Sequence, residues 1–173
     1  MNMLRLSSLI LIFCVVTFPA LSQNIYNPQT LYESPGGLFD KDSIRDFQIT
    51  FHDANYHNVL VQSFFNDPSY RIPAAIVLGD TSIDSVGVRY KGNSTFCLPN
   101  DQQNPKVPYN LDMNYWVSGQ KLMGKKKLKL ANAWLDPTFA KEFVASRIYK
   151  KYLPTPEVNL VKLHVQGNYL GMF

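Results

Sequence analysis

The sequence predicts an α+β fold in which an antiparallel sheet is packed beside helices. Apolar and polar residues alternate over 45–51, which is typical of a half-buried strand. Apolar residues then recur at helical spacing over 57–65. Two further apolar runs at 72–78 and 83–90 flank the Gly79-Asp80 turn, as in a hairpin. A helix between strands, followed by a tightly connected strand pair, indicates this class.

The second half of the sequence predicts more strands and one more helix. A polar loop follows Tyr90, and the stretch from there to Pro105 has no sustained period, so we expect it to be irregular. Asp136-Pro137 predicts the start of a helix, because a capping acid before a first-turn proline is common there. The apolar side of this helix is expected to carry Phe139, Phe143, Val144, Ile148 and Tyr152. The remaining strands are expected at 107–113, 125–130, 158–165 and 169–173.

The composition is that of a folded protein with a modest positive charge. Of the 173 residues, 46% are hydrophobic, 13% aromatic and 17% charged, which excludes disorder, coiled coils and low-complexity fibres. The formal net charge is +4. This charge permits an anionic ligand, but a nucleic-acid partner would require a denser basic face and is not expected.

The first 22 residues have the pattern of a signal peptide. Arg5 supplies a positive charge, Leu6 to Phe18 form an apolar run, and Ala20-Leu21-Ser22 offers small residues for cleavage before Gln23. The apolar run is too short for a membrane span. We therefore expect a secreted or cell-envelope protein with no membrane span after cleavage.

Residues 23–43 are expected to form an extended leader, and residues 44–173 a single domain. After signal cleavage only Cys97 remains, which excludes an internal disulfide and a zinc site built on cysteines. The sequence stops at Phe173 within an apolar strand pattern. Because domains seldom end in this way, we expect the chain to be the front part of a longer protein.

One strand end combines basic residues with a turn of small polar residues. Arg89 and Lys91 lead into Gly92, Asn93 and Ser94, whose backbone N–H groups can surround an anion. The spacing is not that of a Walker A loop. Read alone, the segment fits either a phosphate site or a solvated hairpin end.

Further basic candidates lie on two later strands. Lys106 precedes the strand at 107–113, and Lys125, Lys127 and Lys129 alternate with leucines on the next strand. Read alone, the second group is typical of a solvated strand face.

Three blocks, GVRYKGNST, PKVPYNLDMN and KLMGKKKLKLANAWLDPTFAKEFVASRIYKKYLPTPEVNLVKLHVQGNYLGMF, resemble the CotH kinase family of atypical secreted protein kinases. The family pattern has a G-[VI]-R-x-K-G-N-[ST] strand end, a basic residue before a hairpin and a Leu-Lys-Leu strand followed by Asp. A helix with a basic-Glu pair and a strand pair ending in N/G-x-Y-x-G come next. All blocks occur here in order over residues 44–173.

The resemblance implies a kinase that uses ATP and Mg²⁺ or another divalent metal to phosphorylate Ser or Thr of a secreted or coat protein. Residues 44–173 would be its small, nucleotide-clamping lobe. Within this lobe Lys91, Asn93 and Ser94 would approach the phosphates, and Lys127 or Lys129 would pair with Glu142 as in protein kinases. Arg89 and Lys106 are further candidate nucleotide ligands. The catalytic and metal-binding aspartates would lie beyond Phe173, in a C-terminal lobe that is the expected partner of this one.

Two other functions fit the sequence. The chain can be a secreted structural or coat module that keeps the fold without catalysis. It can also be a sugar- or polymer-binding domain that uses exposed aromatic side chains such as Trp116 and Trp134, although their apolar-periodic positions favour packing in the core.

Overall fold

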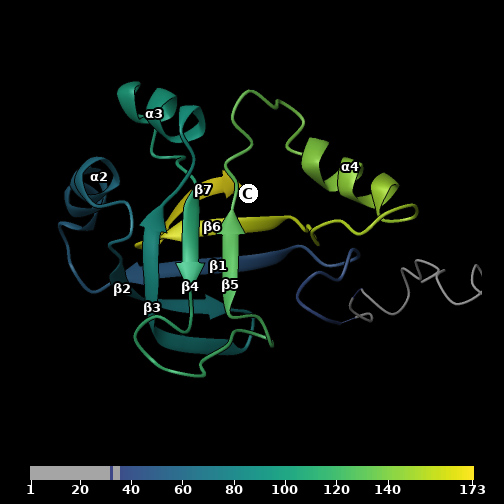
Figure 1. Cartoon of the computed structure of the whole chain (residues 1–173), viewed down its shortest axis with the longest axis horizontal. Helices are drawn as coiled ribbons and strands as arrows, with labels where there is room; N and C mark the ends of the chain where they lie inside the picture. Colours follow the sequence, from purple (N-terminus) through teal and green to yellow (C-terminus); the bar gives the residue numbers. More distant parts are fainter. Residues whose placement is uncertain (1–31, 33–35) are drawn as a thin grey trace, which may run out of the picture.

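The computed structural model describes residue 32 and residues 36–173, and the predicted signal peptide lies outside these residues. The α+β class is confirmed: within these described residues, one seven-stranded sheet has the strand order β5-β4-β3-β2-β1-β6-β7 and is accompanied by three helices (Figure 1). The strands are β1 Arg45–Phe51, β2 Ile72–Leu78, β3 Thr81–Tyr90, β4 Tyr109–Asp112, β5 Lys127–Leu130, β6 Val161–Val165 and β7 Asn168–Met172. The helices are α2 Tyr56–Asn66, α3 Ser94–Asp101 and α4 Lys141–Tyr149.

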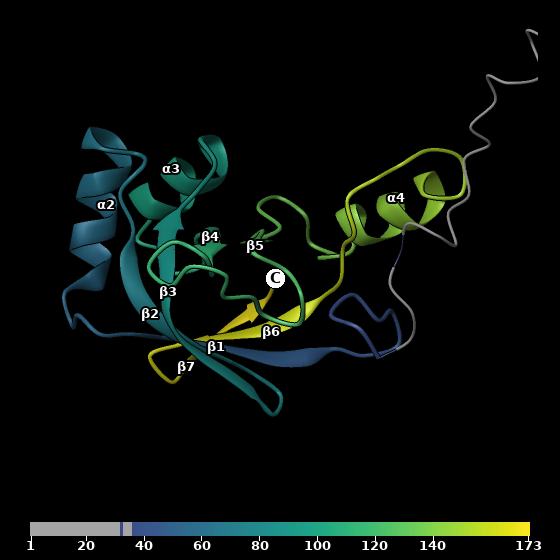
Figure 2. The same cartoon turned by 60° about the horizontal axis from the view of Figure 1, so that its bottom comes forward.

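The core lies on the inner face of the sheet, which curls so that β5 returns towards β6 and β7 (Figure 2). Alternate residues of β1 point inward, and Phe47 and Ile49 are almost completely buried. Leu60 of α2 and Phe96 of α3 close one end of this core and are fully buried. Phe173 pairs with Val161 through two backbone hydrogen bonds of 2.9 and 3.0 Å, which brings the last residue into the same core.

The prediction of a purely antiparallel sheet is wrong at one strand pair. β1 pairs with β6 in parallel, in the register Arg45–Val161 to Ile49–Val165, whereas its pairing with β2 is antiparallel. The alternation within a strand fixes which face is buried but carries no information about the direction of a distant partner. β7 pairs only with β6 and forms one edge of the sheet, as β5 forms the other.

Two helices differ from the sequence prediction. Residues 94–101 form α3 although an irregular stretch was expected, and this helix contains Pro99 and has no side-chain cap at Asn93. α4 begins at Lys141, because Asp136 and Pro137 instead lie in a turn. The expected apolar side of α4 is not buried: the helix has no buried residue and stands away from α2 and α3, beyond β5 (Figure 1).

The chain just before β1 is held against the sheet by side chains. The Arg45 guanidinium donates to the carbonyls of Gly36, Gly37 and Leu38, at 2.9–3.2 Å. The Asn159 amide donates to the carbonyls of Asp40 and Ser43, at 2.7 and 3.0 Å. Leu38 is buried in the core, so the packed structure includes part of the region expected to be an extended leader.

Trp116 is not in the core, contrary to expectation. It lies on the loop between β4 and β5 with 52% of its surface exposed, and it packs edge-on against the exposed Tyr115 ring at 4.9 Å between centroids. No helix among the described residues is long and apolar enough to cross a membrane.

Candidate functional site

The loop after β3 has a backbone that only glycine accommodates. Gly92 has a φ of +87°, and a Cβ at this position would collide with Oγ1 of Thr95. The Asn93 carbonyl then accepts hydrogen bonds from the N–H groups of Phe96 and Cys97, at 3.0 and 2.8 Å, which begins α3. Gly92 therefore turns the chain directly from β3 into a helix, with Asn93 and Ser94 at the start of that helix.

Lys91 lies at the centre of a small group of charged side chains. Its backbone N–H donates to the Pro108 carbonyl at 3.1 Å, which fixes it beside the start of β4. Partial burial lowers the pKa of Lys91; the nearby Glu142 carboxylate opposes this shift and the Lys129 ammonium adds to it. The charges of two other predicted residues, Lys129 of β5 and Glu142 in the first turn of α4, therefore act on Lys91 at the end of β3.

The lysines of the β5 segment are not equivalent. Lys129 is opposite Asn110 of β4, whereas Lys127 is opposite Asp112 and forms an ion pair with it. Lys125 forms an ion pair with Glu157 at 3.1 Å. Within residues 36–173, no ion pair joins Glu142 to either strand lysine. Of the β5 lysines, Lys129 is the one whose charge acts on Lys91.

Arg89 points towards the loop after α2. Its guanidinium donates to the Pro68 carbonyl at 2.6 Å. It lies close to Arg71, whose guanidinium is held by the Gly87 carbonyl and by two oxygens of Asn110, at 2.9–3.0 Å. Burial lowers the pKa of Arg71, and the charge of Arg89 lowers it further. Arg71 therefore ties the start of β2 to β3 and β4, and Arg89 ties β3 to the loop after α2.

Lys106 has aromatic neighbours. Its ammonium lies 4.0 Å from the centroid of the Phe139 ring and 5.3 Å from that of Phe173. Partial burial lowers the pKa of Lys106. The site therefore offers a second desolvated cation, next to the last residue of the sequence.

Asn132 positions Lys106, and the sequence analysis did not identify it. The buried Asn132 amide donates to the Lys106 carbonyl at 2.8 Å and to the Thr95 carbonyl at 2.9 Å. This side chain therefore ties the segment after β5 to α3 and to Lys106. The sequence LANAWLDPT could have indicated this role, because the polar Asn132 interrupts an apolar run directly after a strand.

The Asp136 side chain holds the start of α4 in place. Its carboxylate accepts hydrogen bonds from the Thr138 hydroxyl at 2.6 Å, the Lys141 N–H at 2.9 Å and the Thr138 N–H at 3.0 Å. The Thr138 hydroxyl contributes most to lowering the pKa of Asp136. This network fixes the start of α4 and hence the position of Glu142 one residue later.

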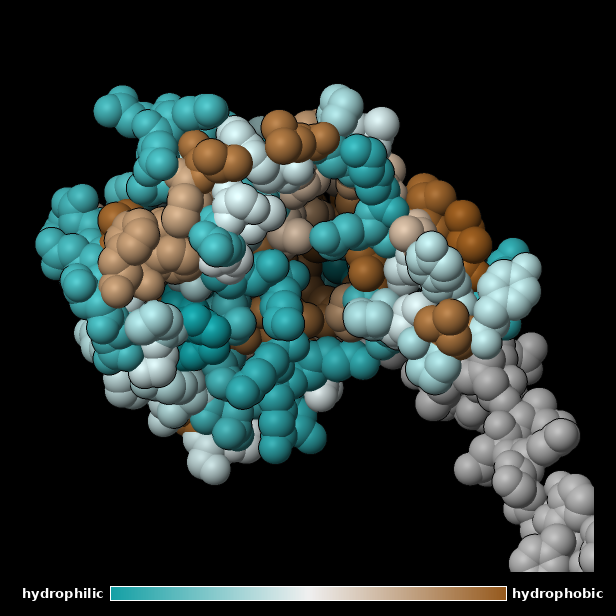
Figure 3. All heavy atoms as spheres, turned by 45° about the horizontal axis from the view of Figure 1, so that its top comes forward, coloured by the Kyte–Doolittle hydropathy of each residue, from teal (hydrophilic) through white to brown (hydrophobic). Residues whose placement is uncertain are grey.

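A small pocket opens beside these lysines. It has a volume of about 60 Å³ and is lined by Phe47, Leu128, Leu130, Val161 and Phe173, with Lys129 at its wall. The face turned forward in Figure 3 is hollowed near its middle, and apolar side chains are visible inside the hollow. This volume is well below the roughly 300–1,000 Å³ of ordinary ligand pockets, so only a small apolar group fits in it, next to the Lys129 side chain.

Lysine ammonium groups are the main charged groups of this candidate site. The charges of Lys91, Lys106 and Lys129 at one end of the sheet fit phosphate groups. Trp134, in the segment that also holds Asn132, has a buried indole N–H with no hydrogen-bond partner in the described structure. A metal fits less well, because no three His, Cys, Asp or Glu side chains come together among residues 32 and 36–173.

Comparison with known proteins supports one family. The family model described as CotH kinase protein matches residues 88–173, which includes all the candidate site residues. This match confirms the resemblance seen in the sequence blocks. No curated protein matches the chain.

Proposed function

Because the chain belongs to the CotH kinase protein family, we propose that it is the nucleotide-clamping part of an exported atypical protein kinase. The complete protein would transfer phosphate from ATP to Ser or Thr of a secreted or coat protein. The observation that carries the proposal is that the charges of Lys129 on β5 and of Glu142 on α4 both act on the partly buried Lys91 at the end of β3. Protein kinases hold ATP phosphates with a strand lysine that is oriented by a helix glutamate.

Each residue has a defined role in this proposal. Lys91 and Lys129 bind the phosphates, and Glu142, whose charge acts on Lys91, orients the Lys91 ammonium. Lys106 supplies a further cation beside the pocket that ends at Phe173. Bound ATP supplies the phosphoryl group. The described residues offer no cluster of metal ligands, so we assign no metal-dependent step to this chain.

Lys91 acts as an anion ligand because it is partly desolvated. A lysine that burial has pushed towards its neutral form regains a stable charge when a phosphate binds beside it. Glu142 cannot replace the phosphate, because no ion pair joins it to either strand lysine in residues 36–173. The site is therefore arranged to accept an additional anion.

The experiment is a titration of residues 23–173 with a fluorescent ATP analogue. Lys91→Ala should weaken binding by about tenfold or more, since a charge-assisted contact to phosphate contributes roughly 1.5–3 kcal/mol. The matched control is Lys162→Ala, which removes an exposed lysine of β6 outside the site. Equal affinities of the two variants would contradict the proposal.

A second candidate function is supported by the exposed pair Tyr115 and Trp116. Two adjacent aromatic rings on a surface loop can stack against a sugar polymer, which is the role of a non-catalytic coat or polymer-binding module. Quenching or enhancement of tryptophan fluorescence by oligosaccharides, abolished in Trp116→Ala, would favour this function. If the protein binds the ATP analogue but does not respond to any oligosaccharide, only the kinase proposal stands.

A further inference from the structure

The connection between β4 and β5, residues 113–126, carries a group of exposed apolar side chains and is here called the hairpin tip. Tyr115, Trp116 and Val117 follow one another in the sequence and are 44–52% exposed, and Met123 is 37% exposed. Exposed apolar side chains that are gathered in this way mark a surface that binds a partner. The hairpin tip follows the end of β4, so it lies at the end of the sheet away from α3 (Figure 1).

Met123 occupies a backbone position that is unfavourable for an apolar residue. Leu122 and Lys125 exchange two backbone hydrogen bonds of 2.9 and 3.0 Å around the turn Met123-Gly124. Both turn residues have a positive φ, +46° and +83°. Such turns favour Asn, Asp or Gly at the first of these positions, so methionine is kept here at a cost in backbone energy. Local costs of this kind are found at functional positions, which indicates that the exposed Met123 side chain is used.

The aromatic part of the hairpin tip is held in place before any partner binds. A Cβ at Gly87 of β3 would lie 2.7 Å from the Tyr115 Cβ, so glycine at this position lets Tyr115 pack on the sheet. The Arg71 guanidinium lies 5.7 Å from the centroid of the Tyr115 ring. The Asn114 side chain accepts a hydrogen bond from the Gly119 N–H at 2.6 Å, which closes the loop. A partner therefore binds without having to order this loop.

The same part of the chain is basic. Residues 113–135 contain five lysines and no Asp or Glu. Lys121 and Lys126 are exposed, and neither forms an ion pair within the described residues 36–173. The carboxylates of the neighbouring Asp112 and Asp84 are each in contact with a basic side chain of the sheet. The hairpin tip thus combines apolar side chains with unpaired positive charges.

We propose that the hairpin tip docks on an anionic phospholipid surface. Trp116, Val117 and Met123 enter the headgroup region, and the ammonium groups of Lys121 and Lys126 meet the lipid phosphates. Tryptophan is favoured at this depth, because its ring is apolar and its N–H is polar. Lysines near an anionic surface add an electrostatic attraction to the apolar contact. The inference does not depend on nucleotide binding.

Two other partners fit these side chains less well. A sugar polymer stacks on flat aromatic faces, but the rings of Tyr115 and Trp116 are nearly perpendicular, at 86°, and share no plane. A sugar also gives no apolar contact to the aliphatic side chains of Val117 and Met123. An acidic polypeptide would pair with the lysines but would leave the exposed apolar side chains unexplained. A phospholipid surface accounts for the lysines and for the apolar group together.

Docking through the hairpin tip leaves the charged site open. The Lys91 N–H is bound to the Pro108 carbonyl beside the start of β4, whereas the hairpin tip follows the end of that strand. The two therefore lie at opposite ends of β4. A docked chain directs Lys91 away from the lipid, and a ligand in solution still reaches it.

The first test measures co-sedimentation with vesicles. The chain should begin at Gln23, which keeps every described residue and removes the apolar run at 6–18 that would bind lipid by itself. It should bind vesicles of equimolar phosphatidylglycerol and phosphatidylcholine more tightly than vesicles of phosphatidylcholine alone, and added salt should weaken this binding. Equal binding to the two kinds of vesicle would overturn the proposal.

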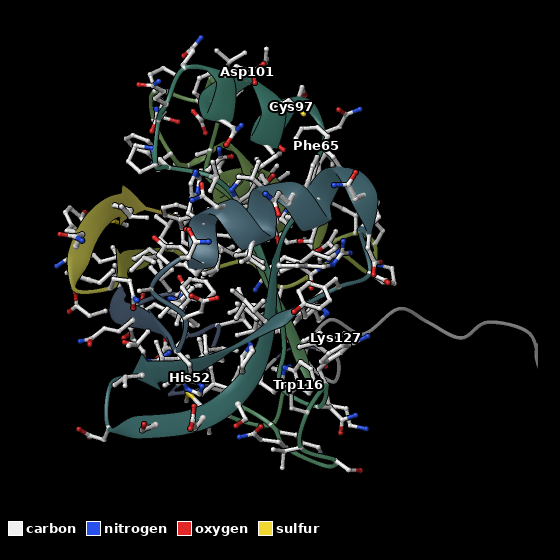
Figure 4. The ribbon with its side chains drawn as sticks, turned by 90° about the vertical axis from the view of Figure 1, so that its left-hand side faces the viewer. His52, Phe65, Cys97, Asp101, Trp116 and Lys127 are labelled. Atoms are coloured by element: carbon white, nitrogen blue, oxygen red, sulfur yellow. The ribbon has the colours of Figure 1, made fainter. Side chains whose placement is uncertain are left out.

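The aromatic contribution is tested by one pair of variants. Trp116→Ala should lower the partition coefficient onto the anionic vesicles by about tenfold, because it removes the side chain best suited to the headgroup region. Phe65→Ala removes an exposed ring at the opposite end of the molecule and should leave binding unchanged (Figure 4). Equal binding of the two variants contradicts the proposal.

The charge contribution is tested by a second pair. Lys121→Ser/Lys126→Ser should lower the partition coefficient by about tenfold or more, because two attractions to the anionic surface are lost. Lys151→Ser/Lys162→Ser is the matched control, since it removes two exposed lysines outside the hairpin tip. Equal losses in the two double variants would show that net charge alone drives binding, and would overturn the proposal.

Insertion is tested with brominated phosphatidylglycerol, which quenches a tryptophan only where its ring enters the bilayer. Quenching should occur in the wild type and disappear in Trp116→Phe, because Trp134 lies outside the hairpin tip. Quenching that persists in Trp116→Phe would overturn the proposal. A fluorescence response to oligosaccharides or to polyglutamate, with none to vesicles, would do the same by identifying a different partner.

Discussion

The Lys127 ammonium and the Asp112 carboxylate form an ion pair across β5 and β4, with Nζ and Oδ2 3.2 Å apart. Asp112 is nearly buried, whereas the Lys127 side chain is 69% exposed. Lys127 and Trp116 lie on the same side of the molecule, away from α3 (Figure 4). This pairing separates two lysines that the sequence left equivalent: Lys127 neutralises a carboxylate of the sheet, and Lys129 faces the Lys91 group.

The two β5 lysines should therefore respond differently to substitution. Lys129→Ala should weaken binding of an ATP analogue by about tenfold, because it removes a cation from the phosphate site. Lys127→Ala should change this affinity by less than about twofold, because the Lys127 ammonium pairs with Asp112 on the neighbouring strand. Calorimetric titration of both variants measures the difference. A larger loss of affinity in Lys127→Ala than in Lys129→Ala would show that Lys127, and not Lys129, contacts the phosphate.

Nucleotide affinity should decrease at alkaline pH. The pKa of Lys91 is lowered by burial, so its ammonium loses the proton at a lower pH than an ordinary lysine with a pKa of 10.5. Affinity for a phosphate ligand should fall as the pH rises through this lowered pKa. Lys91→Arg provides the control, because arginine stays charged over the same range. An identical decrease in both proteins would assign the titration to another group.

The free energy of unfolding should rise with pH over the range in which nucleotide affinity falls. A folded-state pKa below the unfolded value means that the unfolded chain binds more protons between the two pKa values, so the free energy of unfolding rises with pH there. Lys91→Met removes this contribution. The variant should gain stability over the wild type at neutral pH, and the gain should shrink as the pH rises through the lowered pKa. Urea denaturation at a series of pH values measures it.

Gly92→Ala should destabilise the protein more than Gly79→Ala. Both glycines have a positive φ, so alanine strains the backbone at either site by about 1–2 kcal/mol. At Gly79 there is open space, whereas at Gly92 the new Cβ meets the Thr95 side chain. The difference in unfolding free energy between the two variants measures the cost of this collision. Equal losses of unfolding free energy would show that the loop relaxes to avoid it.

Leu60→Ala should cost about 2–5 kcal/mol of unfolding free energy, because this side chain is fully buried and is the only buried residue of α2. Phe65→Ala on the same helix serves as the control. Its ring is 61% exposed, so the loss should stay below about 1 kcal/mol. Comparable losses would mean that α2 is oriented differently on the sheet.

Local patterns were sufficient for much of the fold. The alternation of β1 and the apolar runs of β2 and β3 gave their positions within about two residues, because each pattern is a direct consequence of a half-buried or buried strand. α3 could not be predicted in the same way. It is short, contains Pro99 and lacks a side-chain cap, so tertiary packing of Phe96 determines it rather than its own propensity.

The candidate site was accessible to sequence analysis only in part. Lys91 follows a recognisable strand-to-turn transition, and the family pattern indicated Glu142 and either Lys127 or Lys129. The position of Lys106 between Phe139 and Phe173 depends on contacts between segments far apart in the chain. No local pattern reports such a contact, and the same is true of the two carbonyls that Asn132 joins.

The parallel pairing of β1 with β6 has a consequence for how the chain acquires its structure. Asp46 and His164, which are joined by a hydrogen bond, are 118 residues apart in sequence. β1, β2 and β3 can pair soon after they leave the ribosome, but one edge of β1 stays open until β6 has been synthesised. This closure gives the fold a high contact order, so completion of the sheet is expected to limit the folding rate. Until then the open edge of β1 offers backbone groups to other chains, and nascent molecules depend on being kept apart.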